Sequence, residues 1–200
     1  MEIPDKSLVW LPERGIGFYP VSANPYGQAY FEEYERRAQT PVGALITNAR
    51  IDLVRRWWGD PVLDVGIGCG AFLEQLPGSR GYDINPVGIE WLRVRGLFSD
   101  PAEHAVDAMT FWDSLEHIPE IDRLLKNCRR WAFVSIPVFR DCEHVLTSRH
   151  LKKSEHYWYF TRYGFAIWAH ERGFAIREQS KMEQAFGRED IESFALERVR

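Results

Sequence analysis

The feature that most constrains this chain is a short apolar segment that runs into three closely spaced glycines. Residues 62–65 read VLDV, and Gly66, Gly68 and Gly70 follow at alternate positions before a helix-like stretch that starts at Ala71. A strand that turns through glycines into a helix lets a ligand approach the backbone where a Cβ would collide. The amino end of the following helix also favours an anionic group on that ligand. A tight turn that binds no ligand is the alternative.

Strand-like and helix-like segments alternate after this turn. The apolar, strand-like segments are 61–65, 81–84, 105–112, 131–139, 174–178 and 191–199. The helix-like segments are 71–76, 86–95, 117–128 and 161–172, and the stretch 140–160 looks irregular. This alternation predicts an α/β domain with helices on both faces of a mainly parallel sheet.

The ends of the predicted sheet differ from its middle. No long helix separates the last two segments, so the final strand is expected to run antiparallel in a hairpin. The link over residues 96–105 leaves room for only a brief or distorted third strand. We therefore predict a Rossmann-like sheet of seven strands that is parallel except for its last strand.

An aromatic arm precedes the predicted sheet. Residues 1–27 contain Trp, Phe and Tyr at a density that is typical of an ordered segment rather than a linker. Tyr26, Tyr30 and Tyr34 follow at intervals of four residues and so share one face of a helix. That face either packs on the core or forms an aromatic lid over a pocket.

The chain length bounds the domain organisation. A chain of 200 residues suits one domain and can bury a core without a disulfide or a metal. Thr40 and Pro41 predict the start of a second helix over 41–57, as N-cap and first helical residue. We expect residues 1–58 to form the arm and the helices that cover a pocket, and residues 59–200 to form the core.

Charge and cysteine content narrow the partners and the compartment. The 25 Lys and Arg against 29 Asp and Glu give a net charge of −4, which argues against binding to duplex nucleic acid. The cysteines Cys69, Cys128 and Cys142 form no CxxC pair, which favours free thiols and a cytoplasmic location. No run of 18 apolar residues predicts a membrane span, and the first residues do not resemble a signal peptide.

Two acidic residues near the glycine turn indicate the chemistry of a ligand. Asp64 lies in an apolar strand, and a buried carboxylate is costly unless a cation or hydrogen-bond donors accompany it. Asp83 closes the next strand, where it could accept hydrogen bonds from ribose hydroxyls or cap a turn. The spacing of Gly66, Gly68 and Ala71 also fits a dinucleotide fingerprint, but Asp64 would repel a pyrophosphate. An ammonium group suits it better, which favours S-adenosylmethionine over a nicotinamide dinucleotide.

Three motifs in order resemble a known family. VLDVGIGCGAFLEQL and GYDINP look like the first two motifs of the class I S-adenosylmethionine-dependent methyltransferases. DAMTFWDSLEHI, over residues 107–118, is similar to the fourth-strand motif of their small-molecule branch, and GFAIREQS…IESFALER resembles their last hairpin. The resemblance covers about residues 60–200. It implies an enzyme that moves a methyl group from S-adenosylmethionine to an oxygen or nitrogen atom of a small acceptor.

The same resemblance assigns cofactor-binding roles. The residues that would face the methionine part of the cofactor are Asp64, Gly66, Ile67, Gly68, Trp112 and Asp113. Asp83 would bind the ribose, Ile84 would pack on the adenine, and Tyr30 or Tyr34 would close over the cofactor. The short link leaves the contact with the adenine edge open between Ser99 and Asp100.

Candidate catalytic residues follow from the chemistry of methyl transfer. The leaving group departs neutral, so the protein needs only to position the acceptor and to remove its proton where it has one. Histidine is a suitable base near neutral pH. We predict His156 and His117 as candidate bases and Glu116 as a third candidate that could instead orient a histidine. Local structural hydrogen bonds are the alternative roles. No spacing of His and Cys matches a metal-site rule, so we predict no metal.

Other activities stay open at this point. The chain lacks a [DNS]-P-P-[YFW] box after the fourth strand and a Pro-Cys nucleophile, which argues against methylation of nucleic-acid bases. A nicotinamide-dinucleotide-dependent oxidoreductase and a catalytically silent cofactor-binding module are the two alternatives to a small-molecule methyltransferase. The oligomeric state is not set by the sequence.

Overall fold

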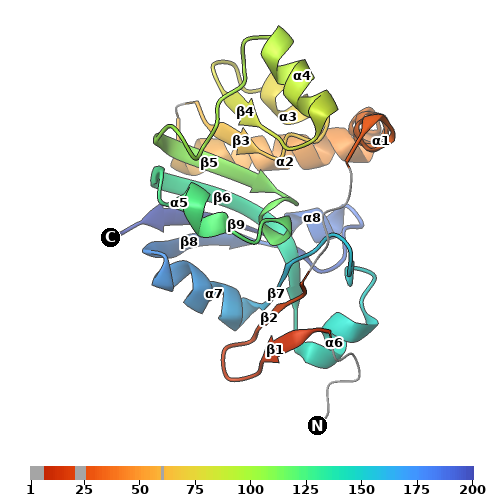
Figure 1. The fold of residues 1–200 in the computed structure, drawn as a ribbon, viewed down its shortest axis with the longest axis vertical. Coiled ribbons are helices and arrows are strands. Elements are labelled where there is room, and N and C mark those ends of the chain that lie inside the picture. Colours follow the sequence, from red (N-terminus) through yellow and green to blue (C-terminus); the bar gives the residue numbers. More distant parts are fainter. Residues whose placement is uncertain (1–6, 21–25, 60) are drawn as a thin grey trace.

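The computed structural model describes residues 7–20, 26–59 and 61–200 (Figure 1). The strands are β1 (Val9–Leu11), β2 (Ile16–Phe18), β3 (Leu63–Val65), β4 (Arg80–Tyr82), β5 (Val106–Trp112), β6 (Cys128–Phe139), β7 (Trp158–Thr161), β8 (Phe174–Ser180) and β9 (Ile191–Arg198). The helices are α1 (Gln28–Ala38), α2 (Pro41–Trp57), α3 (Ala71–Glu74), α4 (Pro86–Val94), the 3-10 helix η1 (Leu115–His117), α5 (Ile121–Leu125), α6 (Cys142–Thr147), α7 (Arg162–Glu171) and α8 (Met182–Ala185).

Six strands form the central part of the sheet, in the order β4-β3-β5-β6-β9-β8. Within it, β9 runs antiparallel to both of its neighbours, and the other strands run parallel to one another. The predicted Rossmann-like class and the closing hairpin are therefore confirmed. The predicted third strand is reduced to a single parallel bridge between Gly81 and Phe98, as the short link requires.

The strand count differs from the predicted seven because β6 extends beyond the central sheet. Its last two residues, Val138 and Phe139, pair with β7 in parallel. β2 then pairs antiparallel with β7, and β1 pairs antiparallel with β2, so the sheet has nine strands among the described residues. The arm thus contributes two strands as well as α1, although residues 1–6 and 21–25 of the predicted arm lie outside the described residues.

Two apolar core clusters occupy opposite faces of the central sheet. Side chains alternate along a strand, so Met109 and Phe111 of β5 point to one face and Ala108 and Trp112 to the other. The first face packs against α5 and α7, and the second against α2, α3 and α4. In Figure 1, α3 and α4 lie beside β3 and β4, and α7 lies along β8 at the other end of the sheet.

Side-chain caps and a proline set several helix boundaries. The Oγ1 atoms of Thr40 and Thr161 accept hydrogen bonds from the backbone N–H groups three residues ahead, as expected of N-caps. The prediction of one helix over 117–128 was wrong, because two shorter helices, η1 and α5, form in its place. Pro119 holds Ile118 in an extended conformation and so separates them. The stretch 140–160, expected to be irregular, contains α6 and the start of β7.

Among the described residues, no helix is both long enough and apolar enough to cross a membrane.

Candidate active site

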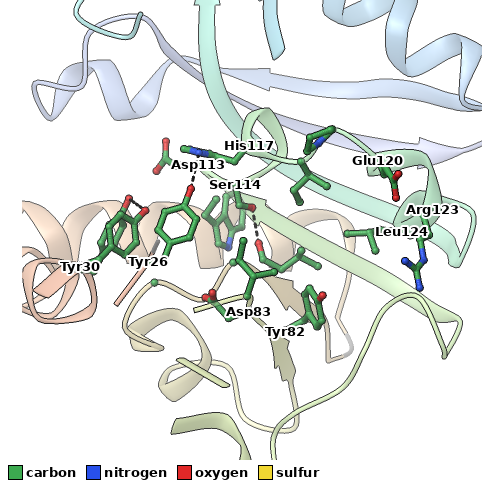
Figure 2. A pocket seen from close by; sticks show the side chains of 18 residues that line it. Tyr26, Tyr30, Tyr82, Asp83, Asp113, Ser114, His117, Glu120, Arg123 and Leu124 are labelled. Atoms are coloured by element: carbon green, nitrogen blue, oxygen red, sulfur yellow. Dashed lines mark hydrogen bonds between the residues drawn. The ribbon is translucent and has the colours of Figure 1, made fainter. Parts of the chain in front are cut away.

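A cavity of about 300 Å³ lies at the carboxyl ends of β3, β4 and β5 (Figure 2). Its lining residues include Val65, Gly66, Gly68, Tyr82, Asp83, Ile84, Trp112, Asp113, Ser114 and His117, with Tyr26, Tyr30 and Tyr34. A second cavity of about 170 Å³ adjoins it and includes Asp64, Ile67 and Arg50 in its lining. The cavities share Tyr34, Gly66, Gly68, Trp112 and Asp113, so together they form one curved cleft over the glycine turn.

The glycine turn is held between the loop after β5 and helix α1. Gly66 and Gly68 have φ angles of +83° and +59°, a region that side chains with a Cβ rarely adopt. A Cβ on Gly66 would lie 2.6 Å from the Cβ of Ser114. A Cβ on Gly68 would lie 2.9 Å from Cδ1 of Tyr34. Both positions therefore need glycine for conformation and for space.

Asp83 lies at the end of β4 with its carboxylate both at a turn and at the cavity. Its Oδ1 accepts a hydrogen bond of 2.8 Å from the backbone N–H of Asn85. Burial raises the pKa of Asp83, and nearby backbone N–H groups oppose that shift. Gly88 leaves room for the carboxylate, since a Cβ there would lie 3.2 Å from Cγ of Asp83. Ile84 is 64% exposed at the cavity rim, an apolar surface available to a ligand.

Asp64 meets a hydrogen-bond donor from the neighbouring strand. It pairs in register with Thr110 of β5, and its Oδ1 accepts a 2.6 Å hydrogen bond from the Thr110 hydroxyl. The residue is 1% exposed, and burial raises the pKa of its carboxyl to about 7 against the opposing effects of Thr110 and Arg50. A cationic ligand group in the smaller cavity would favour the ionised carboxylate.

A largely buried cluster of four charges, which we call the arginine–carboxylate cluster, lies beside the cleft. It consists of Arg50, Asp113, Glu183 and Arg188. Arg50 donates to Asp113 at 2.7 Å and to Glu183 at 2.9 Å, and Arg188 binds the same two carboxylates. Glu183 also accepts a hydrogen bond from Ser135. The cluster carries no net charge and joins α2, the end of β5 and the segment around α8.

Asp113, a predicted cofactor-binding residue, lines both cavities, but its carboxylate is held by the protein. It has a φ of +54°, and each of its oxygens accepts from a guanidinium group. Burial by itself would raise the pKa of Asp113, but Arg188 and Arg50 outweigh it and hold the pKa well below its usual range. The preceding Trp112 is buried under Arg50, whose guanidinium carbon lies 5.3 Å from the ring centroid. Its Nε1 has no hydrogen-bond partner among the described residues.

The tyrosine face of α1 borders the cleft. The rings of Tyr30 and Tyr34 lie 4.7 Å apart, and the Tyr30 hydroxyl donates to the Tyr34 hydroxyl at 3.1 Å. Tyr26 stacks edge-on against Tyr30 and brings its hydroxyl within 3.4 Å of Nδ1 of His117. Phe31 is the residue of α1 that is buried in the core. All three tyrosines line the larger cavity. Of the two alternatives for this face, the structure therefore favours the one in which it borders a pocket rather than packing on the core.

The three predicted catalytic residues come together beside the larger cavity. Figure 2 shows His117 on the opposite side of that pocket from Asp83. Glu116 and His156 are 2% and 4% exposed, and the rings of His117 and His156 lie 4.6 Å apart. Burial raises the pKa of Glu116 well above its usual range and lowers the pKa of both histidines. Of the three, only His117 lines the larger cavity directly.

Comparison with known proteins places this site in a family. A family model described as a methyltransferase domain matches residues 25–179. The chain therefore belongs to this methyltransferase family, and the resemblance seen in the sequence is confirmed. No protein with a curated function matches the chain significantly.

Several solved structures share the fold. Magnesium protoporphyrin IX methyltransferase from Synechocystis PCC 6803, with bound S-adenosylhomocysteine, aligns with a TM-score of 0.60 and 14% identity over 86% of this chain and 95% of that one. The 1,6-didemethyltoxoflavin-N1-methyltransferase of Burkholderia thailandensis has a TM-score of 0.55 and 14% identity over 100% and 99%. An S-adenosylmethionine-dependent methyltransferase from Archaeoglobus fulgidus has a TM-score of 0.57 and 17% identity over 85% and 100%. At these identities the likeness shows the fold alone.

Proposed function

We propose that this protein binds S-adenosylmethionine in the curved cleft and transfers its methyl group to an oxygen or nitrogen atom of a small-molecule acceptor. The observation that carries the proposal is the cleft itself, which runs over the glycine turn from Asp83 to Asp64. When bound, S-adenosylmethionine supplies a methyl group attached to a positively charged sulfur.

The two adjoining cavities suit the two halves of this cofactor. In the larger cavity, the Asp83 carboxylate would accept hydrogen bonds from the ribose hydroxyls, and Ile84 would pack on the adenine. In the smaller cavity, Asp64 would attract the ammonium group of the methionine part. The backbone of Gly66–Gly68 lies between them, and Trp112 offers an indole N–H that has no partner within the part of the chain that the structure describes. The neutral arginine–carboxylate cluster adds no net charge that would repel either end.

The acceptor would lie on the side of the cleft that His117 lines, with Glu116 and His156 behind it. The net charge of −4 supports a small acceptor over duplex nucleic acid. The arm and helices of residues 1–58 would cover the cleft of the 59–200 core, and the free cysteines support a cytoplasmic location.

Calorimetric titration separates this function from its two alternatives. We expect saturable, micromolar binding of S-adenosylhomocysteine and no binding of NAD⁺. Binding of NAD⁺ without S-adenosylhomocysteine would favour the oxidoreductase instead. Incubation with S-adenosylmethionine and a panel of phenols, hydroxy acids and amines tests catalysis. Cofactor binding without any formation of S-adenosylhomocysteine across that panel would favour the silent module.

A further inference from the structure

Two distant segments meet beside the cleft and bring three metal-ligand side chains together. Glu116 and His117 belong to η1 after β5, and His156 precedes β7. The backbone N–H of Tyr157 donates to the carbonyl of Glu116 at 2.7 Å and holds the two segments against each other. One potential ligand atom from each of Glu116, His117 and His156 lies within 4.8 Å of the other two.

Two polar atoms of this triad lack the partners that buried groups normally have. Oε2 of Glu116 and Nδ1 of His156 are buried and accept or donate no hydrogen bond among the described residues. Glu116 and His156 are both more than nine-tenths buried. A buried polar atom without a partner costs about 1–3 kcal/mol. Two such atoms on two residues of one triad indicate a ligand that satisfies both at once.

We propose that Glu116, His117 and His156 bind a divalent transition-metal ion, of the class of Zn²⁺ or Fe²⁺, with open coordination positions toward the cleft. Two imidazoles and one carboxylate form the ligand set of catalytic zinc and non-haem iron sites, which keep positions open for water or substrate. Magnesium and calcium fit less well because they prefer oxygen ligands. A divalent cation would also supply the positive charge that the buried Glu116 carboxylate lacks.

The spacing of the three side chains is close to what such an ion requires, because one potential ligand atom of each lies within 4.8 Å of the other two. A tetrahedral ion holds its ligand atoms roughly 3.4 Å apart. Side-chain rotations that move the ligand atoms by on the order of an ångström would therefore bring the triad to this spacing.

The site also indicates which acceptor atom the enzyme methylates, a step that rests on the proposed function. An amine that binds the ion through its lone pair has none left to attack a methyl group. A hydroxyl oxygen can bind the ion with one lone pair and keep another. In that reaction the O–H bond breaks and its proton passes to solvent. The S–CH₃ bond breaks with its electron pair left on sulfur, and one O–CH₃ bond forms. The metal site therefore favours a hydroxyl acceptor over an amine.

Cobalt is a suitable probe because Co²⁺ occupies such sites and absorbs visible light. The protein is treated with EDTA, dialysed free of it and titrated with CoCl₂, with absorbance and calorimetry as readouts. We expect one Co²⁺ per chain. Glu116→Gln and His156→Ala should each weaken binding at least tenfold. His104→Ala, in an exposed turn away from the cleft, is the matched histidine control and should leave it unchanged.

Titration of every variant with S-adenosylhomocysteine checks the fold and keeps the two proposals apart. Unchanged affinity for S-adenosylhomocysteine shows that a variant which loses Co²⁺ is still folded. The metal proposal is overturned if the wild-type chain shows no saturable Co²⁺ binding, or if both triad variants bind Co²⁺ as tightly as wild type. Binding of Co²⁺ at the triad without any binding of S-adenosylhomocysteine would instead overturn the proposed function.

Discussion

The two sides of the cleft are built in different ways. The side that contains the glycine turn and Asp83 comes from one continuous segment, from β3 to the first turn of α4. The hydrogen bond that holds its Asp83 carboxylate comes from Asn85, a neighbour in the chain, although Ser114 and Tyr34 lie against the glycine turn itself. The opposite side contains the arginine–carboxylate cluster and the Glu116–His117–His156 triad. Its residues come from α2, the end of β5, the segment before β7 and the segment around α8.

Under the proposed function, this difference would separate cofactor binding from the chemistry of the methyl acceptor. The glycine-turn side offers backbone groups and a carboxylate that could accept hydrogen bonds from ribose hydroxyls, and a whole fold family can share these features. The opposite side depends on long-range contacts between charged groups, so a change there affects the fold as well as the site. Substitutions on the two sides should therefore give different readouts.

Substitution of the glycine turn should have the largest effect on binding. Gly68→Val would place side-chain atoms against the ring of Tyr34 in a strained backbone conformation, and we expect S-adenosylhomocysteine binding to weaken more than a hundredfold. Gly96→Val is the matched control because Gly96 has a similar φ of +67° and no atom within 4 Å of the position that a Cβ would take. Calorimetry on both variants checks this. Equal losses in the two variants would assign the effect to backbone strain and contradict the steric account.

Substitution on the opposite side should appear first in stability. Arg50→Ala leaves the buried Glu183 and the partly buried Asp113 with Arg188 as their remaining cation, and we expect a loss of about 3–5 kcal/mol in the free energy of unfolding. Arg56→Ala is the control on the same helix, because Arg56 is exposed and its pair with the partly exposed Glu178 should contribute no more than about 1 kcal/mol. Urea unfolding monitored by circular dichroism measures both. A loss from Arg50→Ala as small as that of the control would show that the cluster does not hold the two segments together.

Removal of the Asp83 carboxylate should have an intermediate effect on binding. Asp83→Ala should weaken the binding of S-adenosylhomocysteine by about 1.5–3 kcal/mol, the scale of hydrogen bonds to a charged group. Oδ1 of Asp100 accepts the same type of hydrogen bond, from the backbone N–H of Ala102, but Asp100 is not among the residues that line the cavity. Asp100→Ala should therefore change affinity little. The opposite ranking, measured by calorimetry, would move the ribose or adenine contact to the 96–105 link.

The smallest expected effect is the dependence of binding on pH. Asp64 has a pKa of about 7, and only its ionised form attracts the ligand ammonium group. As the pH falls below 7 the carboxyl is protonated, and affinity should drop by up to about tenfold per pH unit. Above about pH 8 the ligand α-amino group loses its own proton, so affinity should be highest between these values. Thr110, Arg50 and Asp83 also influence Asp64. Titrations of Asp64→Asn isolate its part, and an unchanged acidic limb in that variant would contradict the assignment.

The sequence predicted the parts of the molecule whose causes are local. The glycine turn, the N-caps at Thr40 and Thr161 and the position of Asp83 all depend on residues within a few positions, and the structure has each of these local features. The single helix predicted after β5 was wrong because Pro119 holds Ile118 in an extended conformation and interrupts the helix there. The strands β1, β2 and β7 were missed because each has only three or four residues and is fixed by pairing with the others.

The opposite side of the cleft could not be predicted in the same way. Arg50, Glu183 and Arg188 are separated by up to 138 positions, and nothing in their immediate neighbours indicates that they meet. The residues of the triad were each candidates, but their spacing of 40 positions from Glu116 to His156 follows no metal-site rule. Their proximity depends on the way β6 and β7 return the chain to the end of β5.

A crystal structure with S-adenosylhomocysteine bound tests the central claim most directly, because it locates both ends of the ligand at once. We predict that both ribose hydroxyls lie within hydrogen-bond distance of the Asp83 carboxylate, with the ammonium group toward Asp64. The sulfur should lie near the glycine turn and face the side of His117. A ligand bound in another cavity, or in this cleft with its ribose away from Asp83, would contradict the account.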